Sequence, residues 1–490
     1  MFLKEERSMN APEFRGSLYI DGRWCEADSG RTCELLNPAT EQAICRVASC
    51  SRAEVERAIA AAEKAGTAWR EMTPYQRQAP LRNTAGLIRQ RADEVAEVLT
   101  TEQGKPLAEA RLEVLANATF FEWYAEEGTR VYGEIVPSHF SNKRLFVFHQ
   151  PVGVCAMISP WNFPLFLQGR KIAPALAAGC TCVCRPSTET PLSLIKLFEI
   201  MEDAGVPPGV ANLVIGPADE CMDAFYETPA VRQISFSGST EVGKQIMRRS
   251  AEQVKRISIE LGGHAPFLAF PDYGAAAAAR FAAASKFRNA GQSCIAASRF
   301  YVHEEIYDEF CQAAVAEAEN LVLGNGLDEG VTMGPVCTAD ARQKTMALIQ
   351  DALDKGAKLL CGGKPPADKP KGYFVEPTII TNVTAEMQVM VEEPFCPVMP
   401  VVPFKTLDEA LQMANDTEYG LAGYIATRDA ATALKAAEGL EVCIISVGDY
   451  SPATVLCPFG GMKQSGIGRE GGREGIAEYL ESKYVSLSID

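Results

Sequence analysis

The chain has 490 residues and a formal net charge of −16, with 47% hydrophobic and 22% charged residues. This length exceeds what one compact core accommodates, so we expect two or three domains. The composition excludes disordered, collagen-like and disulfide-dense proteins. The acidic balance disfavours general attraction to nucleic acid or to anionic lipid.

The first residues place acidic side chains beside basic ones with no apolar run behind them, so the sequence predicts no secretory signal. No later stretch is long and apolar enough to span a bilayer. We therefore expect a cytoplasmic protein in which the 16 cysteines are reduced thiols. Because the chain has only four histidines, a histidine-rich metal site or a histidine triad is disfavoured.

Apolar periodicity predicts helices over 52–66 and 75–101, and from about Pro151 onward strands and helices alternate. The elements expected there are strands at 152–158, 182–184, 211–215 and 233–236, a helix ending near 179, and helices over 191–204 and 241–251. Such alternation indicates a parallel sheet with helices on its faces.

An Ala-rich helix from Asp272 to Ala284 opens a second α/β pattern that continues to about Gly448. Alternating runs at 130–137 and 144–150 predict a β-hairpin outside the main sheets, and an exposed hairpin invites pairing between subunits. The fold class expected is therefore α/β, with two doubly wound α/β lobes and a small β-hairpin element.

The run 287–294 ends in Cys294, which follows a predicted helix and a glycine-bearing turn. Backbone amides in such a turn stabilise a thiolate, which makes Cys294 a candidate nucleophile. Most cysteines of a reduced chain are instead buried apolar residues, so the assignment needs support from other segments.

Other segments carry groups that a nucleophile needs. Glu260 ends a predicted strand before two glycines and is a candidate general base, with a capping or surface carboxylate as the alternative. Asn162 stands between Pro160 and Pro164 in a stiff loop, where its amide suits an oxyanion hole or satisfies its own turn. Residues 237–243 combine a strand end, a glycine-rich turn and a helix start, which fits a phosphate cradle and an ordinary turn equally.

Six segments together resemble the aldehyde dehydrogenase superfamily in order and spacing, over nearly the whole chain: 160–164, 238–243, 260–263, 291–294, 392–395 and 458–461. The resemblance is closest to the succinate-semialdehyde dehydrogenases. It implies that Cys294 attacks an aldehyde as a thiolate and that the Asn162 side chain and the Cys294 amide hold the oxyanion. It also implies that Glu260 activates the water that hydrolyses the resulting thioester to a carboxylate.

The same resemblance implies a nicotinamide dinucleotide as hydride acceptor. Members that prefer NAD commonly carry Lys and Glu at the positions of Arg185 and Thr188. Thr188 lacks the carboxylate that would repel a 2′-phosphate, and the Arg185 guanidinium could bind one, so the sequence predicts a preference for NADP. NAD is the alternative, which Glu189 favours. The cofactor-binding residues implied are Ser159, Pro160, Trp161, Arg185, Ser187, Thr188, Gly238, Ser239, Gly243, Leu261, Glu393 and Phe395.

Arg170 and Arg288 resemble the carboxylate-binding arginines of succinate-semialdehyde dehydrogenases, and Phe459 would line the aldehyde tunnel. They predict succinate semialdehyde as substrate, with ion pairs to structural carboxylates as the alternative role. The serine that this subfamily often carries a few residues before Pro458 is absent. Another semialdehyde, a sulfonate-bearing aldehyde or a short aliphatic aldehyde therefore stays open as the substrate.

Three other positions depart from the family pattern. Ala296 replaces a cysteine that forms a redox disulfide with the nucleophile in some members, while Cys396 and Gly448 replace a common Gly and Asn. The alternating cysteines of 180–184 share one strand face, which suggests a metal, but their place in the dinucleotide sheet favours buried packing. We expect no metal.

The resemblance also divides the chain: residues 1–129 and 150–260 form a dinucleotide-binding domain, 261–474 a catalytic domain, and 130–149 with 475–490 an oligomerisation element. It implies a homodimer or homotetramer. A rival interpretation, a cofactor-free cysteine hydrolase, requires a histidine beside Cys294, and His264 is the only candidate nearby in sequence. A binding protein that lost its activity is disfavoured because Cys294, Glu260 and Asn162 are all present.

Overall fold

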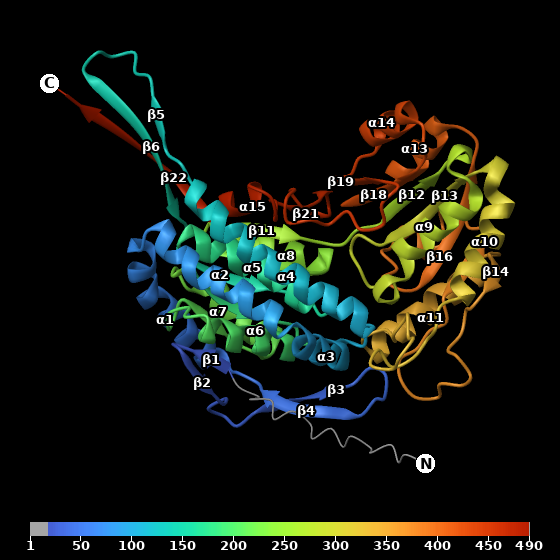
Figure 1. The fold of residues 1–490 in the computed structure, drawn as a ribbon, viewed down its shortest axis with the longest axis horizontal. Coiled ribbons are helices and arrows are strands. Elements are labelled where there is room, and N and C mark those ends of the chain that lie inside the picture. Colours follow the sequence, from blue (N-terminus) through green and yellow to red (C-terminus); the bar gives the residue numbers. More distant parts are fainter. Residues whose placement is uncertain (1–17, 490) are drawn as a thin grey trace.

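The structure is a computed structural model that describes residues 18–489. Residues 1–17, on which the expectation about a secretory signal rests, lie outside this range. Figure 1 shows two α/β lobes side by side and a three-stranded arm that projects from the first lobe. The predicted α/β fold class is confirmed.

The first lobe is built on an eight-stranded sheet of order β2-β1-β9-β8-β7-β10-β11-β21. Its five central strands run parallel: β7 (Val154–Ile158), β8 (Thr181–Arg185), β9 (Ala211–Leu213), β10 (Val231–Ser237) and β11 (Arg256–Glu260). The edge strands β1 (Leu18–Ile20), β2 (Arg23–Cys25) and β21 (Gly466–Ile467) pair antiparallel. From β7 the chain adds β8 and β9 on one side and then β10 and β11 on the other. The loops after β7 and β10 therefore diverge, which opens a crevice at the carboxyl ends of these strands.

The helices of the first lobe follow the predicted alternation, with two differences. They are α1 (Arg52–Glu71), α2 (Pro74–Gln90), α3 (Ala92–Gln103), α4 (Leu107–Glu127), α5 (Pro164–Ala178), α6 (Leu192–Asp203), α7 (Ala218–Glu227) and α8 (Thr240–Ala251). The prediction of one helical segment over 75–101 is wrong, because Arg91 (φ −103°, ψ 17°) leaves the helical conformation between α2 and α3. The second difference is that neither α4 nor α7 is predicted from the sequence; α4 packs against α2, α3 and α5 and has no clean apolar stripe.

The second lobe contains a seven-stranded sheet of order β14-β15-β16-β13-β12-β18-β19, parallel except at β14. Its strands are β12 (Ala265–Ala269), β13 (Ala297–His303), β14 (Lys358–Cys361), β15 (Thr378–Thr381), β16 (Val398–Phe404), β18 (Ala422–Ala426) and β19 (Ile444–Val447). Its helices are α9 (Ala275–Phe287), α10 (Tyr307–Glu319), α11 (Ala339–Asp354), α12 (Gln388–Val391), α13 (Leu407–Asn415) and α14 (Ala430–Gly439). The predicted Ala-rich helix is α9, which begins at Ala275 after a 3-10 turn at Pro271–Tyr273.

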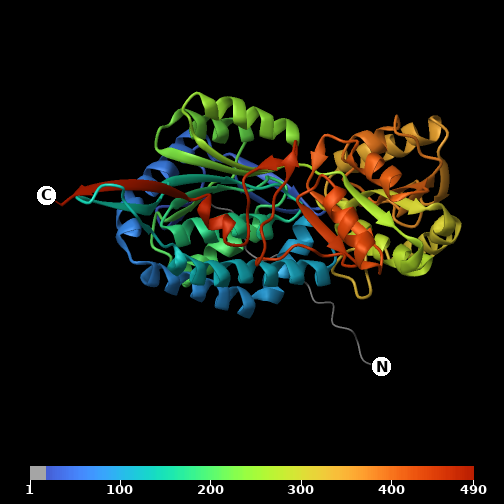
Figure 2. The same cartoon turned by 90° about the horizontal axis from the view of Figure 1, so that it is seen from above.

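The arm consists of β5 (Glu134–Val136), β6 (Lys143–Pro151) and the C-terminal strand β22 (Leu480–Ser488), all antiparallel. It confirms the predicted hairpin and stands away from both lobes in two views (Figure 1 and Figure 2). Its apolar side chains face solvent, with Ile135 77% exposed and Tyr484 62% exposed. Outside these sheets lie the pairs β3 (Thr32–Leu36) with β4 (Ala43–Ala48) and β17 (Tyr419–Gly420) with β20 (Met462–Lys463), and the short helix α15 (Glu474–Ala477).

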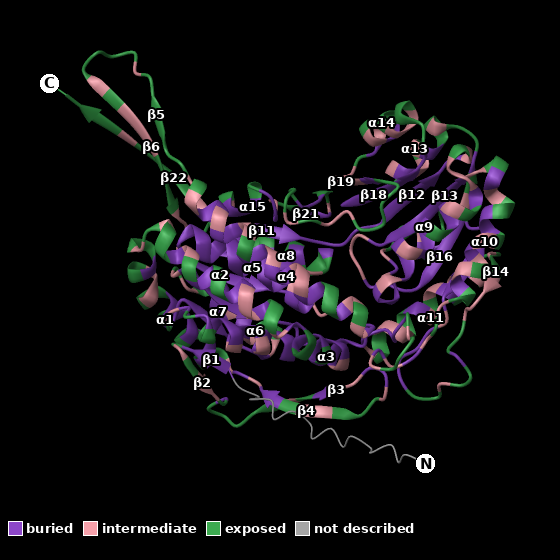
Figure 3. Ribbon diagram, in the orientation of Figure 1, coloured by how far each residue is buried: buried purple, intermediate pink, exposed green. Residues whose placement is uncertain are grey.

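Burial follows the two main sheets, as the purple ribbons of Figure 3 show. All five residues of β7 are buried. The alternating cysteines lie next to it in β8, where the Sγ atoms of Cys182 and Cys184 are buried and 3.7 Å apart. These thiols therefore pack in the core of the first lobe, as the sequence analysis predicts.

All 16 cysteines lie within the described residues and none of them forms a disulfide, which agrees with the prediction of reduced thiols. No helix between residues 18 and 489 is long and apolar enough to cross a membrane. Over the same stretch, no three His, Cys, Asp or Glu side chains are grouped so that they could hold a metal ion.

A matched pair of glycine substitutions tests the packing of the first lobe. A Cβ built on Gly169 of α5 overlaps Asn117 Oδ1 of α4, so we expect Gly169→Ala to lower the free energy of unfolding by about 1–3 kcal/mol through overpacking. Gly86 of α2 has no atom within 4 Å of its built Cβ, and Gly86→Ala should raise that free energy by about 0.5–1 kcal/mol. Urea denaturation measures both, and a Gly169→Ala protein as stable as the parent contradicts this α4–α5 contact.

Candidate active site

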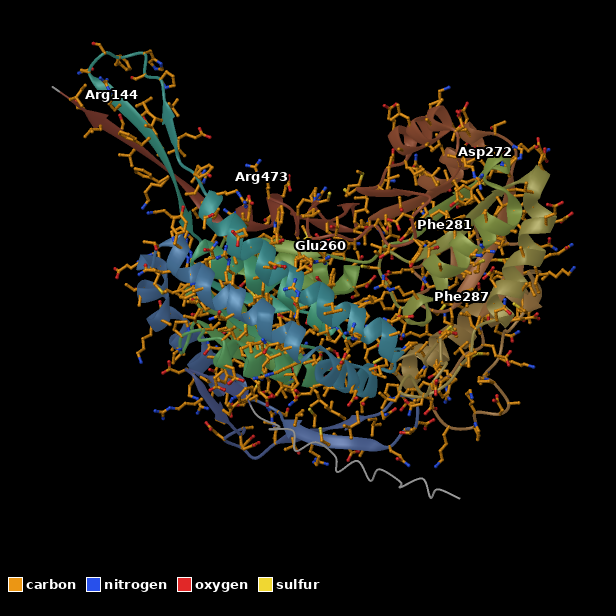
Figure 4. All side chains as sticks on the ribbon, viewed as in Figure 1. Arg144, Glu260, Asp272, Phe281, Phe287 and Arg473 are labelled. Carbon is orange, nitrogen blue, oxygen red and sulfur yellow. The ribbon has the colours of Figure 1, made fainter. Side chains whose placement is uncertain are left out.

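A cleft of about 1480 Å³ is lined by residues of both lobes. Figure 4 labels Glu260 at the end of β11 in the first lobe and Phe287 at the end of α9 in the second. Asn162, from the loop after β7, and Cys294, from the segment after α9, line the same cleft as Glu260. The fold therefore brings the three residues predicted to be catalytic to one place, although they are far apart in sequence.

The chain after α9 is bent sharply before it reaches Cys294. Asn289 (φ 50°), Ala290 (φ 52°) and Gly291 (φ 74°) all have left-handed backbone conformations. A Cβ at Gly291 would overlap the main-chain oxygen of Cys396, so only glycine fits this bend. The bend directs Cys294 into the cleft instead of continuing the helix.

Cys294 follows this bend by three residues and is half-buried. The pKa of the Cys294 thiol is raised to about 12, chiefly by burial and then by the carboxylates of Glu393 and Glu260, while Arg170 opposes the increase. The predicted stabilisation of the thiolate by backbone amides is therefore outweighed by loss of water and by nearby negative charge. In the protein alone, this cysteine is a protonated thiol at neutral pH.

Glu260 is 4% exposed, and neither of its carboxylate oxygens has a hydrogen-bond partner among the described residues. The alternatives of a helix cap or a surface carboxylate are thus wrong. Burial raises the pKa of Glu260 well above its usual value and Glu470 adds to this effect, while Arg170 and Lys171 oppose it. A carboxylate with a raised pKa can accept a proton near neutral pH, as a general base must.

Glu470, Arg170 and Lys171 form a buried charge cluster next to Glu260. Arg170 Nε lies 2.5 Å from Glu470 Oε2, and Lys171 Nζ pairs with the other oxygen of the same carboxylate. Burial opposes the ionisation of Glu470, yet Arg170 and Lys171 hold the pKa of Glu470 below its usual value. Sequence reasoning missed Glu470 and Lys171, because no local pattern links residues about 300 positions apart.

The Asn162 side chain is directed toward the segment that carries Cys294. Its Nδ2 donates to the main-chain oxygen of Gln292 over 3.1 Å, and its Oδ1 is buried without a partner among the described residues. This amide therefore bonds across 130 residues rather than within its own turn. The arrangement fits an oxyanion donor held next to the candidate nucleophile.

Several of the predicted cofactor-binding residues line the cleft: Pro160, Trp161, Gly238, Ser239, Leu261, Glu393 and Phe395. Trp161 and Phe395 make an edge-to-face contact with ring centroids 5.6 Å apart. Ser239 caps α8 by accepting a hydrogen bond from Val242 N, so the positive end of this helix faces the cleft. Burial raises the pKa of Glu393 to about 8.

The five other predicted cofactor-binding residues, Ser159, Arg185, Ser187, Thr188 and Gly243, are not part of the cleft lining. Arg185 Nη2 instead donates to the main-chain oxygen of Gly216 over 3.0 Å. The cleft is lined in this region by Glu189, which accepts hydrogen bonds from Ser187 Oγ and Thr188 Oγ1. The guanidinium that predicts NADP preference is thus occupied, while the carboxylate that favours NAD faces the cleft.

The two predicted substrate arginines have different surroundings. Arg170 lines the cleft and lies 4.0 Å from the centroid of Phe459, but its charge is paired with Glu470. Arg288 is half-buried, and its Nη1 lies 3.4 Å from Ser451 Oγ. Of the three predicted substrate-binding residues, only Arg170 is part of the cleft lining; Arg288 and Phe459 are not.

His264 does not serve the rival hydrolase interpretation. Its Nδ1 is 2.7 Å from Ser298 Oγ in the buried part of the second lobe, and burial lowers the pKa of His264 well below its usual value. A cysteine hydrolase needs the imidazole to accept the thiol proton. Nδ1 of His264 contacts this serine and Nε2 has no hydrogen-bond partner among the described residues, so neither ring nitrogen bonds to the Cys294 thiol.

Comparisons with known proteins find one matching family and several similar chains. The model of the aldehyde dehydrogenase family matches residues 24–485. Glutarate-semialdehyde dehydrogenase of Pseudomonas putida is 45% identical over 98% of this chain and 99% of its own, and 3-sulfolactaldehyde dehydrogenase of Pseudomonas putida is 46% identical over 96% of both. The succinate-semialdehyde dehydrogenase (NADP+) GabD of Escherichia coli is 44% identical over 97% and 98%. A solved succinate-semialdehyde dehydrogenase from Burkholderia pseudomallei has a TM-score of 0.96 at 44% identity, over 98% of this chain and 100% of that one.

The reactivity of Cys294 tests its environment. Because the pKa of Cys294 is about 12, its thiolate fraction should grow about tenfold per pH unit between pH 7 and pH 9. We expect the rate of alkylation by iodoacetamide in the cofactor-free protein to follow that slope, measured on the Cys294 peptide by mass spectrometry. The exposed Cys457 in the same digest reports reagent quality. A plateau for Cys294 below pH 9 contradicts the raised pKa.

Proposed function

This chain belongs to the aldehyde dehydrogenase family and is an NAD(P)-dependent oxidoreductase that acts on an aldehyde, and we propose that its substrate is a short aldehyde with a distal anionic group, succinate semialdehyde first among them. The observation that carries the proposal is the meeting of Cys294, Glu260 and Asn162 at one cleft, with the Arg288 guanidinium 5.7 Å from the ring centroid of Phe163, the residue after Asn162. The relatives' names, glutarate-semialdehyde, 3-sulfolactaldehyde and succinate-semialdehyde dehydrogenase, all describe aldehydes with a carboxylate or sulfonate.

The cleft fits a nicotinamide dinucleotide. The hydroxyl of Ser237 and Glu393 Oε1, both from residues that line the cleft, are buried without hydrogen-bond partners among the described residues. The capped start of α8 offers a positive helix end to a pyrophosphate, and Glu393 offers acceptors to ribose hydroxyls. These unmet groups and the size of the cleft support the binding of a dinucleotide.

In the proposed reaction Glu260 accepts the thiol proton of Cys294, and the sulfur bonds to the aldehyde carbon while the carbonyl electron pair moves to oxygen. Asn162 Nδ2 and the Cys294 amide donate to this oxyanion. A bound nicotinamide dinucleotide supplies the acceptor for the hydride of the former aldehyde carbon, which leaves a thioester on Cys294. Glu260, after losing its proton to solvent, deprotonates a water that attacks the thioester. The carbon–sulfur bond then breaks and releases the carboxylic acid and the thiolate.

We propose that both NAD and NADP are used. Thr188 removes the carboxylate typical of NAD-preferring members, but Glu189 brings one to the cleft and Arg185 is bonded to Gly216. These contacts oppose the NADP preference that the sequence alone predicts. Cofactor choice then depends on the repulsion between Glu189 and a 2′-phosphate.

We propose further that the protein is a cytoplasmic homodimer or homotetramer joined through the arm, with the domains as bounded in the sequence analysis. The free cysteines support a reducing compartment. The exposed apolar side chains of β5, β6 and β22 support a protein interface.

A substrate panel tests the assignment of the anion site. Arg288→Leu should lower kcat/KM for succinate semialdehyde by about 10- to 150-fold, since a charge-assisted hydrogen bond contributes about 1.5–3 kcal/mol, and should change kcat/KM for butanal by less than about threefold. Arg280→Leu, on the exposed side of helix α9, which Arg288 directly follows, is the matched control. Equal losses for the two aldehydes contradict the anion site, and NAD(P)H formation by Cys294→Ala at the parental rate contradicts the proposed chemistry.

The cofactor proposal is tested by removing the Glu189 carboxylate in one variant and by adding a carboxylate at position 188 in another. Glu189→Gln should raise the ratio of kcat/KM for NADP to that for NAD by about fivefold to tenfold, because a like charge near the 2′-phosphate contributes about 1 kcal/mol. Thr188→Glu should lower the same ratio. Initial rates at 340 nm with each cofactor give both ratios, and an unchanged ratio in Glu189→Gln shows that this carboxylate does not select the cofactor.

A further inference from the structure

The loop that carries Asn162 is supported by a buried ion pair from a distant part of the chain. Lys105, just after α3, and Glu113, in α4, have side-chain exposures of 0% and 1%, and Lys105 Nζ lies 2.5 Å from Glu113 Oε2. Neither residue lines the active-site cleft. An ion pair that is buried this completely needs hydrogen-bond partners for all of its polar atoms.

Those partners are main-chain groups on both sides of Asn162. Lys105 Nζ donates to the main-chain oxygen of Asn162 over 2.8 Å and stands 4.0 Å from the centroid of the Phe163 ring. The second oxygen of Glu113 accepts from Leu165 N and Phe166 N, each over 3.1 Å. One ion pair thus fixes the main-chain carbonyl of Asn162 and, just after it, two of the free amides at the start of α5. A carboxylate at this helix start is also favoured by the helix dipole.

Asn289 completes the support from the opposite side. Its Nδ2 donates to the main-chain oxygen of Asn162 over 3.0 Å, so this oxygen accepts from both Lys105 and Asn289. Gln103 Nε2 in turn donates to Asn289 Oδ1 over 3.0 Å, and Asn289 N donates to Glu109 Oε2 over 2.9 Å. These bonds hold Asn289 in its left-handed conformation and tie the Asn162 loop to the segment that carries Cys294.

We propose that Lys105 and Glu113 are positioning residues for the oxyanion donor: they fix the main chain of Asn162 so that its Nδ2 points to where negative charge develops next to Cys294. This inference rests on the proposed role of Asn162. Stability alone does not explain the pair, because replacing a buried ion pair with matched neutral residues is often neutral or stabilising. A displacement of about 1 Å at a reacting group, by contrast, lowers rates by about 100-fold.

The test uses the double variant Lys105→Met/Glu113→Gln, which removes both charges together and leaves no unpaired buried ion. With succinate semialdehyde and saturating cofactor, the pre-steady-state burst of NAD(P)H at 340 nm reports acylation of Cys294. We expect the burst rate constant to fall by about 10- to 100-fold, with the cofactor dissociation constant within about twofold of the parental value. Asn289→Gly keeps the left-handed backbone, removes one donor to Asn162 and gives a second, milder variant that should also lower the burst rate constant.

The decisive comparison repeats both variants in an Asn162→Ala background. If Lys105 and Glu113 act through the Asn162 amide, the additional loss there should shrink to less than about twofold. An equal fold-loss in both backgrounds, or a parental burst rate constant in the double variant, overturns the inference. If Asn162→Ala alone acylates at the parental rate, the proposed oxyanion role fails instead, so the two failures are distinguishable.

Arg77→Met is the matched structural control. Arg77 is a buried cation whose Nε donates to the main-chain oxygen of Ala177 over 3.2 Å, at the opposite end of the same helix α5. Its loss should loosen α5 without moving Asn162, and we expect a burst rate constant within about twofold of the parental value. An equal loss of burst rate in Arg77→Met would mean that general loosening of α5, rather than placement of Asn162, explains the double variant.

Discussion

The active site depends on the burial of Glu260 next to a cluster with an excess positive charge. Arg170 and Lys171 contribute two positive charges and Glu470 one negative charge, so the cluster is neutral only when Glu260 is ionised. Removal from water opposes that ionisation. Burial prevails, with help from the negative charge of Glu470, so the pKa of Glu260 stays well above its usual value and the carboxyl binds a proton more readily than an exposed glutamate does. The same cations limit the negative charge that Cys294 faces.

The order of the strands explains where this chemistry takes place. Between β7 and β10 the sheet of the first lobe changes the direction in which strands are added, and the loop with Asn162 and the start of α8 separate there. The second lobe covers this opening and contributes Cys294 from the bend after α9. The first lobe therefore provides the proposed base and the proposed oxyanion donor, while the second provides the sulfur of the proposed nucleophile.

Sequence reasoning located the parallel strands because buried strands are continuous apolar runs bounded by turns. It singled out Cys294, Glu260 and Asn162 as candidates because each stands at an element end with turn-forming residues beside it. It missed α4, whose apolar residues do not form one stripe, and it missed Glu470 and the support of Lys105, because these groups reach the site only through tertiary packing. Propensity and spacing carry no information about such long-range contacts.

The position of the last strand has a consequence for how the protein is made. β22 pairs with β6 over nine residue pairs, from Leu480 with Pro151 to Ser488 with Lys143, and β21 pairs with β11 beside Glu260. Since a ribosome delivers the chain from its N-terminus, both sheets keep an open edge until the final segment emerges. A growing polypeptide that has not reached Glu470 also lacks the carboxylate that pairs with Arg170 and Lys171, so the surroundings of the proposed base Glu260 are completed only by residues that follow β21.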